Sequence, residues 1–468
     1  MVKLDRFEIV FDNPESAYFA GQEVSGKVII ESSEDKKVNE ILLEIKGRAK
    51  TYWSKGTGKN RKHCGQSEPY FCEQFNTKYT HKFSITSGPN KHEKERILPK
   101  GFHEVPFQYT LPKTLPTSFE GSYGYVRYTC RAICERPWDF DICTKKLFTV
   151  IGIEDMNDDS KLTTPMTCQD ICLSPTTKVF KLCCINNGQQ QVFLELATER
   201  LGFTPGETLS LKGKVENKGR SILKHVHISL IQEVLYKAKN FSGAEFEKKE
   251  CKIILKKNVG DVKGMSTFDL SKSPASEITF LSLPPSLSTC SLIIITYKVV
   301  LSISQESSIY IPITIGTIPL LSEIVTKNIK SAKKIKNGNG NNAKGAKKKS
   351  DVKVTVTDEC GITIKTTPTP SRSNEHSEVD ESELMLPDNN EDQSSNKGLL
   401  LANGHGSTTT KKRVRMASSI LSEIYPQLPP PFFKESFFGP VNVVDDKEDG
   451  YFGDKSFTPK YPVYFDEE

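Results

Sequence analysis

Cysteine and histidine are the residues here that could bind a metal or act as nucleophile and base, and the chain holds twelve and eight of them. The spacings Cys130-x3-Cys134, Cys168-x3-Cys172 and Cys183-Cys184 lack the paired CxxC or downstream HxxxH of a zinc site. His225-x-His227 places both histidines on the polar face of an alternating stretch. No GxSxG, GxxxxGK[ST] or strand-linked GxGxxG occurs. We predict no metal, cofactor or catalytic residue, with a Cys–His pair assembled only by folding left open.

Two short patterns could carry sorting or lipidation instead. Asp380-Glu381-Ser382-Glu383-Leu384-Met385 has the form of an acidic dileucine sorting signal with methionine in the last place. Cys183 and Cys184 could be palmitoylated, or they could open the first strand of a second domain within Phe180–Ile185. Both are hypotheses that a short pattern by itself leaves open.

Charge is uneven along the chain although the net charge is only +6. Lys327–Lys349 holds nine lysines and no acid, whereas Asp445–Glu468 holds eight acids against three lysines. Such blocks are typical of tails rather than of nucleic-acid-binding domains, so no nucleic acid is expected as a partner. The lysine run is interpreted as a solvated linker, and the alternative is contact with anionic phospholipid, at about 1 kcal/mol per lysine.

The apolar segments are short. The amino-terminal residues offer no apolar stretch of signal-peptide length, and Val2 stands where N-myristoylation requires glycine. The longest apolar candidate, Leu292–Leu301, contains Lys298 and has the length of a strand. These features predict a soluble intracellular protein whose cysteines are mostly free thiols.

The elements that would position any site are strands. Alternation of apolar and polar residues appears in four clear segments, which centre on Phe7–Phe11, Ile41–Ile45, Val226–Leu230 and Ile309–Ile315. Helical periodicity is hardly visible, and Gly, Pro and Asn break the chain at short intervals. This pattern predicts an all-β protein built from antiparallel sandwiches of the immunoglobulin type.

An internal repeat indicates two such sandwiches. Tyr18–Val28 and Phe203–Val215 each place an aromatic before a turn glycine and a strand. Leu111–Ser118 resembles Leu283–Cys290, and each leads into a β-rich run. Two similarities in the same order favour a duplicated domain.

Composition sets the expected boundaries. We predict a first sandwich at residues 1–154, a polar connection at 155–177, a second sandwich at 178–320 and a mostly disordered tail at 321–468. A β-like patch at Val352–Ile364 interrupts the tail, and aromatic residues return between Tyr425 and Phe465.

The segment that follows Phe107 carries a family resemblance. It contains LPxxLPxSFEG at Leu111–Gly121, GYVRY at Gly124–Tyr128 and Arg136-Pro137-Trp138. With Phe11-Asp12-Asn13 and Lys46–Ala49, these motifs resemble the amino-terminal domain of the arrestin fold, in its α-arrestin or arrestin-domain-containing branch. The resemblance covers residues 1–150 well and 178–320 more loosely.

This resemblance implies two curved sandwiches that bind cytosolic segments of membrane receptors or transporters. It also implies a non-catalytic adaptor in endocytosis and protein trafficking, cytoplasmic and peripheral at the plasma membrane and endosomes. Arg127 would be a basic residue near the concave cargo surface, and the alternative is a polar-face arginine on an ordinary strand.

The resemblance further implies recruitment of HECT-type ubiquitin ligases, whose WW domains read Pro-Pro-x-Tyr motifs. The expected motif aligns with Pro429, Pro430, Pro431 and Phe433, so phenylalanine replaces the tyrosine. Loss of one hydroxyl hydrogen bond would weaken binding by about 0.5–1.5 kcal/mol. Pro462 and Tyr464 form a second degenerate motif near the end of the chain.

Two other functions stay open. One is a regulatory binding protein whose free cysteines respond to redox state. The resemblance would place such a cysteine within Val262–Ser273, but this stretch contains none, and Cys251 and Cys290 flank it. The other is an endosomal coat-like sorting subunit of the same fold.

Overall fold

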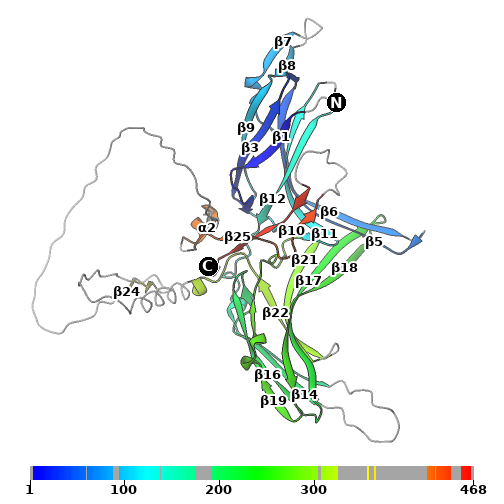
Figure 1. The fold of residues 1–468 in the computed structure, drawn as a ribbon, viewed down its shortest axis with the longest axis vertical. Helices are drawn as coiled ribbons and strands as arrows, with labels where there is room; N and C mark the ends of the chain where they lie inside the picture. The colour runs from blue at the N-terminus through cyan, green and yellow to red at the C-terminus, as the bar shows by residue number, and fades with distance from the viewer. Residues whose placement is uncertain are drawn as a thin grey trace, which may run out of the picture. The chain divides into compact units, whose positions relative to one another are not determined.

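The structure is a computed structural model of the chain, and it describes residues 4–58, 61–87, 94–137, 139–173, 191–303, 307–324, 356–357, 363–364, 419–426, 428–443 and 455–464. It divides into one unit of residues 1–330 with 413–468 and a second unit of residues 331–412. Strands dominate the first unit (Figure 1). In the second unit, the strands β23 (Val356–Thr357) and β24 (Thr363–Ile364) pair antiparallel inside the predicted β-like patch.

The first sandwich packs two sheets face to face. One sheet has the order β1-β3-β9, and the other contains β6, β5, β11, β12 and β2, while β4, β8 and β7 form a small third sheet. Ile41, Leu43 and Ile45 alternate inward and are buried, as are Phe7, Ile9 and Phe11, which confirms the predicted alternation. The strands are β1 (Arg6–Phe11), β2 (Ala17–Phe19), β3 (Glu23–Ser32), β4 (Lys36–Lys37), β5 (Glu40–Lys55), β6 (Lys62–Asn76), β7 (Ser84–Ser87), β8 (Lys94–Leu98), β9 (Gly101–Thr110), β10 (Phe119–Gly121), β11 (Gly124–Glu135) and β12 (Ile142–Ile151), with the short 3-10 helix η2 at Tyr79–Lys82.

The second sandwich repeats this plan, with β13-β14-β16-β19 in one sheet and β18, β17, β21, β22 and β15 in the other. Val226, Ile228 and Leu230 are buried in it, as are the four isoleucines of β22, as predicted. The strands are β13 (Met166–Leu173), β14 (Gln191–Thr198), β15 (Gly202–Phe203), β16 (Thr208–Asn217), β17 (Leu223–Asn240), β18 (Glu245–Val262), β19 (Ser266–Asp269), β20 (Glu277–Thr279), β21 (Ile293–Ser302) and β22 (Ser308–Ile315), with 3-10 helices η3 (Ser160–Thr163), η4 (Leu270–Lys272) and η5 (Pro274–Ser276).

The expected connection at residues 155–177 was too long. Its second half is β13, which pairs antiparallel with β14 from Met166 opposite Thr198 to Leu173 opposite Gln191. The polar composition misled the assignment because β13 is an edge strand, and its alternate side chains face solvent. The second sandwich therefore starts at Met166, before the predicted residue 178.

The two sandwiches share one sheet. β17 of the second sandwich pairs with β6 of the first, with Lys239 opposite Gly65 and Asn240 opposite Cys64. The Thr51 hydroxyl donates to the Lys237 carbonyl at 2.7 Å. The backbone N–H and hydroxyl of Ser291 both donate to the Glu68 carboxylate, at 3.0 and 2.6 Å. Backbone and side-chain hydrogen bonds therefore both tie the sandwiches together.

The structure contains the predicted duplication, but it aligns one pair of repeated segments differently from the sequence. The Ser118 hydroxyl accepts from Val150 N–H at 2.9 Å, and the Ser286 hydroxyl accepts from Ile315 N–H at 3.0 Å. The Tyr128 hydroxyl donates to the Pro116 carbonyl and the Tyr297 hydroxyl to the Pro284 carbonyl, each at 2.6 Å. Leu115–Ser118 is therefore the equivalent of Leu283–Ser286, whereas the sequence repeat aligns Leu111 with Leu283. Hydrogen bonding defines the equivalence, and the repeated Leu-Pro of Leu111–Ser118 obscured it.

None of the helices in the described ranges combines the length and apolar character needed to cross a membrane.

Candidate functional site

The end of the chain folds into a ribbon that carries both predicted ligase motifs. β25 (Phe432–Glu435) pairs antiparallel with β28 (Lys460–Val463), and this places Phe433 directly opposite Pro462. β26 (Val441–Asn442) and β27 (Ser456–Phe457) extend the pairing. We call residues 428–443 and 455–464 the C-terminal ribbon. The expectation of a mostly disordered tail is therefore too broad at its end.

Tyr461 anchors the C-terminal ribbon to the first sandwich. Its side chain is 1% exposed, and its hydroxyl donates to the Ser118 carbonyl at 3.1 Å. The neighbouring Lys460 donates through its backbone N–H to the Thr149 hydroxyl at 3.2 Å. The Lys460 ammonium pairs with Glu15 at 2.9 Å. Because burial disfavours the phenolate, the pKa of Tyr461 lies well above its usual range.

The other strand of the ribbon contacts the second sandwich. The Ser282 hydroxyl donates to the Lys434 carbonyl at 2.9 Å, and Phe437 N–H donates to the Ser282 carbonyl at 2.8 Å. The Lys252 ammonium lies over the Phe438 ring, 5.0 Å from its centroid. The ribbon therefore bridges the two sandwiches.

A small apolar cluster completes the contact. Leu421 of the helix α2 (Ser419–Ile424) is buried with Phe19, Ile151 and Ile318, and Phe433 packs against this cluster. The Phe19 and Phe433 ring centroids are 6.3 Å apart. Tyr425 follows α2, and its hydroxyl donates to the Asp155 carboxylate in the interdomain connection.

This docking covers the predicted motif residues. Pro431, Pro462 and Tyr464 are buried, whereas Pro429, Pro430 and Phe433 are half-buried. The Tyr464 hydroxyl is enclosed without a hydrogen-bond partner among the described residues. A WW groove stacks aromatic side chains against an exposed proline turn, so the docked motifs do not present the surface that it reads.

Arg127 is paired rather than isolated on its strand. Its guanidinium makes a two-point ion pair with Glu120, at 2.6 and 2.9 Å, and the two side chains are 11% and 6% exposed. The same guanidinium stacks over the Tyr125 ring, with its central carbon 3.8 Å from the ring centroid. Arg127 lies on the half-buried face of β11, and the sequence contained no signal that Glu120 lies beside it.

The remaining predicted sites lie outside the described residues. These are Asp380, Leu384 and Met385, Cys183 and Cys184, and the Lys327–Lys349 run. Among the described residues, no group of three His, Cys, Asp or Glu side chains is arranged to hold a metal ion.

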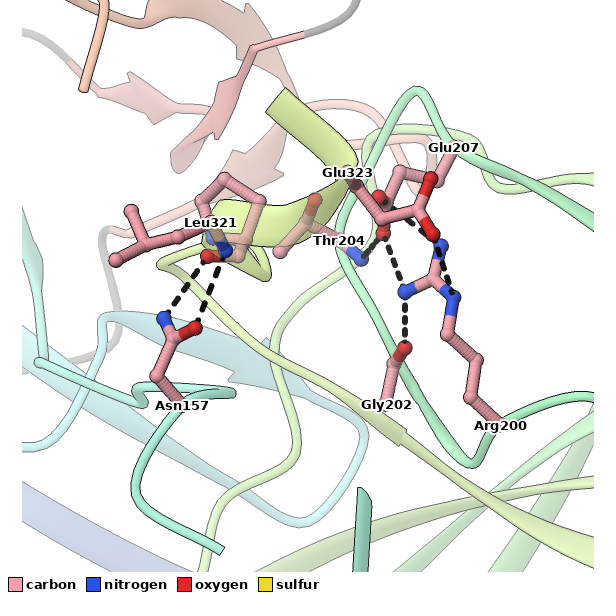
Figure 2. Close-up of polar contacts among 8 residues, drawn as sticks. Asn157, Arg200, Gly202, Thr204, Glu207, Leu321 and Glu323 are labelled. Carbon is pink, nitrogen blue, oxygen red and sulfur yellow. Dashed lines mark hydrogen bonds and ion pairs between the residues drawn. The ribbon is translucent and has the colours of Figure 1, made fainter. Parts of the chain in front are cut away.

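Sequence reasoning missed a polar cluster where the second sandwich meets the connection (Figure 2). Glu207 accepts from the Arg200 guanidinium at 3.1 Å and from Thr204 N–H at 2.7 Å. Arg200 also donates to the Gly202 carbonyl at 2.6 Å. The internal repeat contained a signal for this cluster. Gln22 follows its turn glycine as Glu207 does, and it likewise accepts from a backbone N–H three residues earlier, that of Phe19.

The same region holds the connection against the end of the second sandwich. Asn157 donates to the Pro319 carbonyl at 3.1 Å and accepts from Leu321 N–H at 3.1 Å (Figure 2). Thr317 donates its hydroxyl to the Gly152 carbonyl at 2.7 Å. The start of the connection is therefore held against the segment that follows β22.

Glu154, which immediately precedes this connection, should make stability depend on pH. Partial burial raises the pKa of Glu154 to about 7. Since the folded protein disfavours the carboxylate, the contribution to stability is fullest below the ordinary carboxyl pKa and falls as pH rises from about 4.5 to about 7. The loss is at most about 3 kcal/mol, reduced by the remaining solvent contact.

Glu154→Gln should unfold at a higher temperature than the unsubstituted chain at pH 8 and at nearly the same temperature at pH 4.5. Equal differences at both pH values in calorimetry would contradict this.

Known proteins match both halves of this fold. Residues 7–157 match the family described as "Arrestin (or S-antigen), N-terminal domain", and residues 188–320 match "Arrestin (or S-antigen), C-terminal domain". Arrestin domain-containing protein 17 of Caenorhabditis elegans is 46% identical over 474 residues, which cover 100% of both chains. Thioredoxin-interacting protein of Homo sapiens is 30% identical over 217 residues, which cover 46% of this chain and 51% of that protein. The duplicated sandwiches, their motifs and these matches agree, and the chain belongs to the arrestin-domain-containing, or α-arrestin, family.

Proposed function

We propose that this chain is a non-catalytic adaptor that holds cytosolic segments of membrane proteins on its sandwiches and presents its C-terminal motifs to HECT-type ubiquitin ligases. The observation that supports it most is the pairing of Phe433 with Pro462, which gathers both Pro/aromatic motifs in one ribbon. An adaptor of this kind raises the concentration of the ligase near its cargo, and the ligase supplies the chemistry. The protein would act in the cytoplasm, at the plasma membrane and endosomes.

The docked ribbon adds a condition to this proposal. Pro462 and Tyr464 are buried against the sandwiches, so a WW domain and the sandwiches compete for the same side chains. Ligase binding therefore requires the ribbon to leave its site. The affinity of the full chain is reduced by the fraction of molecules in which the ribbon is docked.

Titration calorimetry with ligase WW domains tests the proposal. The full chain should bind weakly, and the full-length variant Tyr461→Ala should bind at least about tenfold more tightly, because the ribbon is released. Tyr461→Ala combined with Phe433→Ala and Pro462→Ala is the matched control and should lose binding. Absence of binding by Tyr461→Ala at high-micromolar concentration would refute the ligase link.

The redox alternative has one specific observation in its favour, the similarity to thioredoxin-interacting protein over 217 residues. Cys251 and Cys290, which flank Val262–Ser273, are poorly suited to a redox-sensing role. Partial burial and the neighbouring Glu233 raise the pKa of the Cys251 thiol, and the Cys290 side chain is buried. Both effects reduce the reactive thiolate at neutral pH, so the adaptor function is favoured.

A further inference from the structure

One aromatic side chain of the first sandwich lies almost entirely in solvent. Phe140 is 90% exposed, and it belongs to residues 136–141, which join β11 to β12 and which we call the β11–β12 turn. Single apolar side chains on a protein surface are common and need no explanation by themselves. Phe140 differs from them because a largely buried arginine fastens the backbone that carries it.

Arg136 is that arginine. Its side chain is 12% exposed, and its guanidinium donates through both Nε and Nη2 to the Phe140 carbonyl, at 2.8 Å from Nε. The same guanidinium pairs with the Asp139 carboxylate at 2.7 Å, and Phe140 N–H donates to that carboxylate at 2.8 Å. An aromatic side chain that is already held in place loses little conformational entropy when it binds, so it is suited to anchor an interface.

Two acids beside this turn have no cation next to them. Glu135 ends β11 directly opposite Glu40 of β5, and like charges in opposed positions destabilise a sheet. Arg96 pairs with Glu40 at 3.3 Å. Within the part of the chain that the structure describes, neither Glu135 nor Asp141 forms an ion pair. An external cation can therefore pair with both without displacing a partner.

The formal charge at this end of the sandwich is negative. Four acids and two arginines lie in the turn and at the strand ends below it, which gives 2 − 4 = −2. They are Glu40, Glu135, Asp139, Asp141, Arg96 and Arg136. The neighbouring Lys37 and Glu95 pair with each other and add no net charge. An exposed ring face and nearby carboxylates both attract positive charge, whereas the same carboxylates repel anionic phospholipid.

This surface is separate from the junction of the sandwiches. β5 runs from Glu40, at the turn, to Trp53, which pairs with Cys64 where β6 meets β17. The strand between Glu40 and Trp53 spans about 40 Å. The C-terminal ribbon is bonded to Thr149, about 23 Å along β12 from its start at Ile142. A partner at the β11–β12 turn therefore leaves the docked ribbon in place.

We propose that Phe140, Glu135 and Asp141 bind a lysine- and arginine-rich cytosolic segment of a membrane protein, with one cation over the Phe140 ring and others paired with the two carboxylates. The class of partner rests on the proposed adaptor function, because cytosolic loops of membrane proteins carry an excess of lysine and arginine next to their spans. The ring fixes the position of the segment, and the carboxylates add an attraction that weakens with salt.

Fluorescence anisotropy with the full chain and a labelled peptide of alternating arginine and serine tests this surface. At about 0.05 M NaCl the peptide should bind at least about tenfold more tightly than the same peptide with glutamate in place of arginine. Glu135→Gln combined with Asp141→Asn should weaken binding at least about tenfold at this salt concentration and much less at about 0.5 M. Unchanged affinity of this double variant at low salt would overturn the proposal.

Substitutions of Phe140 test the role of the ring. Phe140→Ser and Phe140→Leu should each weaken binding at least about fivefold, whereas Phe140→Trp should keep or increase it, because tryptophan attracts cations most strongly. Phe241→Ser is the matched control, since Phe241 is fully exposed in the turn between β17 and β18 and should not affect binding. If Phe140→Leu bound as tightly as the unsubstituted chain, or if both serine variants lost affinity equally, the proposal would be wrong.

The failure of this proposal can be told apart from failure of the adaptor function. Peptide binding that Phe140→Ser leaves unchanged, together with WW-domain binding by Tyr461→Ala, would refute only the surface at Phe140. Peptide binding at Phe140 without any WW-domain binding would support the surface and refute the ligase link alone. Vesicles of phosphatidylcholine and phosphatidylserine should not bind this surface, and vesicle binding that Phe140→Ser abolishes would overturn the choice of a basic segment.

Discussion

Replacing Tyr461 by alanine should release the C-terminal ribbon from both sandwiches while the sandwiches stay folded. The side chain is fully buried, and its hydroxyl bonds to the Ser118 carbonyl. Truncation of a buried aromatic costs about 3–5 kcal/mol. A loss of 3 kcal/mol lowers the ratio of docked to undocked molecules by roughly 100-fold. Hydrogen exchange should show loss of protection in β25 and β28 and unchanged protection in β5 and β17.

Tyr464→Phe is the matched control for this experiment. Tyr464 is also buried, but its hydroxyl has no hydrogen-bond partner among the described residues. Removing an unpaired buried hydroxyl is neutral or stabilising, so ribbon protection should be kept or increased. If Tyr461→Ala left the exchange of β25 and β28 unchanged, the docked arrangement of the ribbon would be wrong.

Gly213→Ala should strongly destabilise the second sandwich. Gly213 lies in β16 opposite Leu196 of β14, with φ of +140°. A Cβ added there would stand 2.1 Å from the Glu195 carbonyl oxygen. Since β14 is hydrogen-bonded on both edges, the strand has little freedom to move away. The expected cost is about 3 kcal/mol or more, which lowers the melting temperature of the second sandwich by about 6–12 °C.

Gly243→Ala is the control that measures the cost of backbone strain without a steric clash. Gly243 lies in the turn between β17 and β18, with φ of +84° and no atom within 4 Å of an added Cβ. The variant should lose only about 1 kcal/mol, or roughly 2–4 °C. Calorimetry that showed similar losses for both glycines would attribute the effect to φ and contradict the proposed clash with Glu195.

The fold could be predicted from the chain because its signals are local. Alternation in β1, β5, β17 and β22 requires only that neighbouring side chains point to opposite faces, and burial follows it closely. The turn glycines Gly21 and Gly206 stand at the start of the repeat in both sandwiches, with φ of +80° and +91°. The boundary near Met166 and the register at Leu115–Ser118 were missed because both depend on which strand or carbonyl lies opposite.

The C-terminal motifs show most clearly where prediction from the sequence ends. The sequence by itself identified Pro429–Phe433 and Pro462–Tyr464 as candidate motifs, two duplicated sandwiches, and cysteine and histidine spacings unlike those of metal sites. Only the tertiary structure decided that Phe433 faces Pro462, that Tyr461 fills a buried position beside Ser118, and that Arg127 is paired with Glu120. Ser118 and Tyr461 are 343 residues apart, and contacts of that separation leave no periodic trace in the sequence. Local pattern determines which strands form, whereas the closure of long chain segments determines which side chains meet.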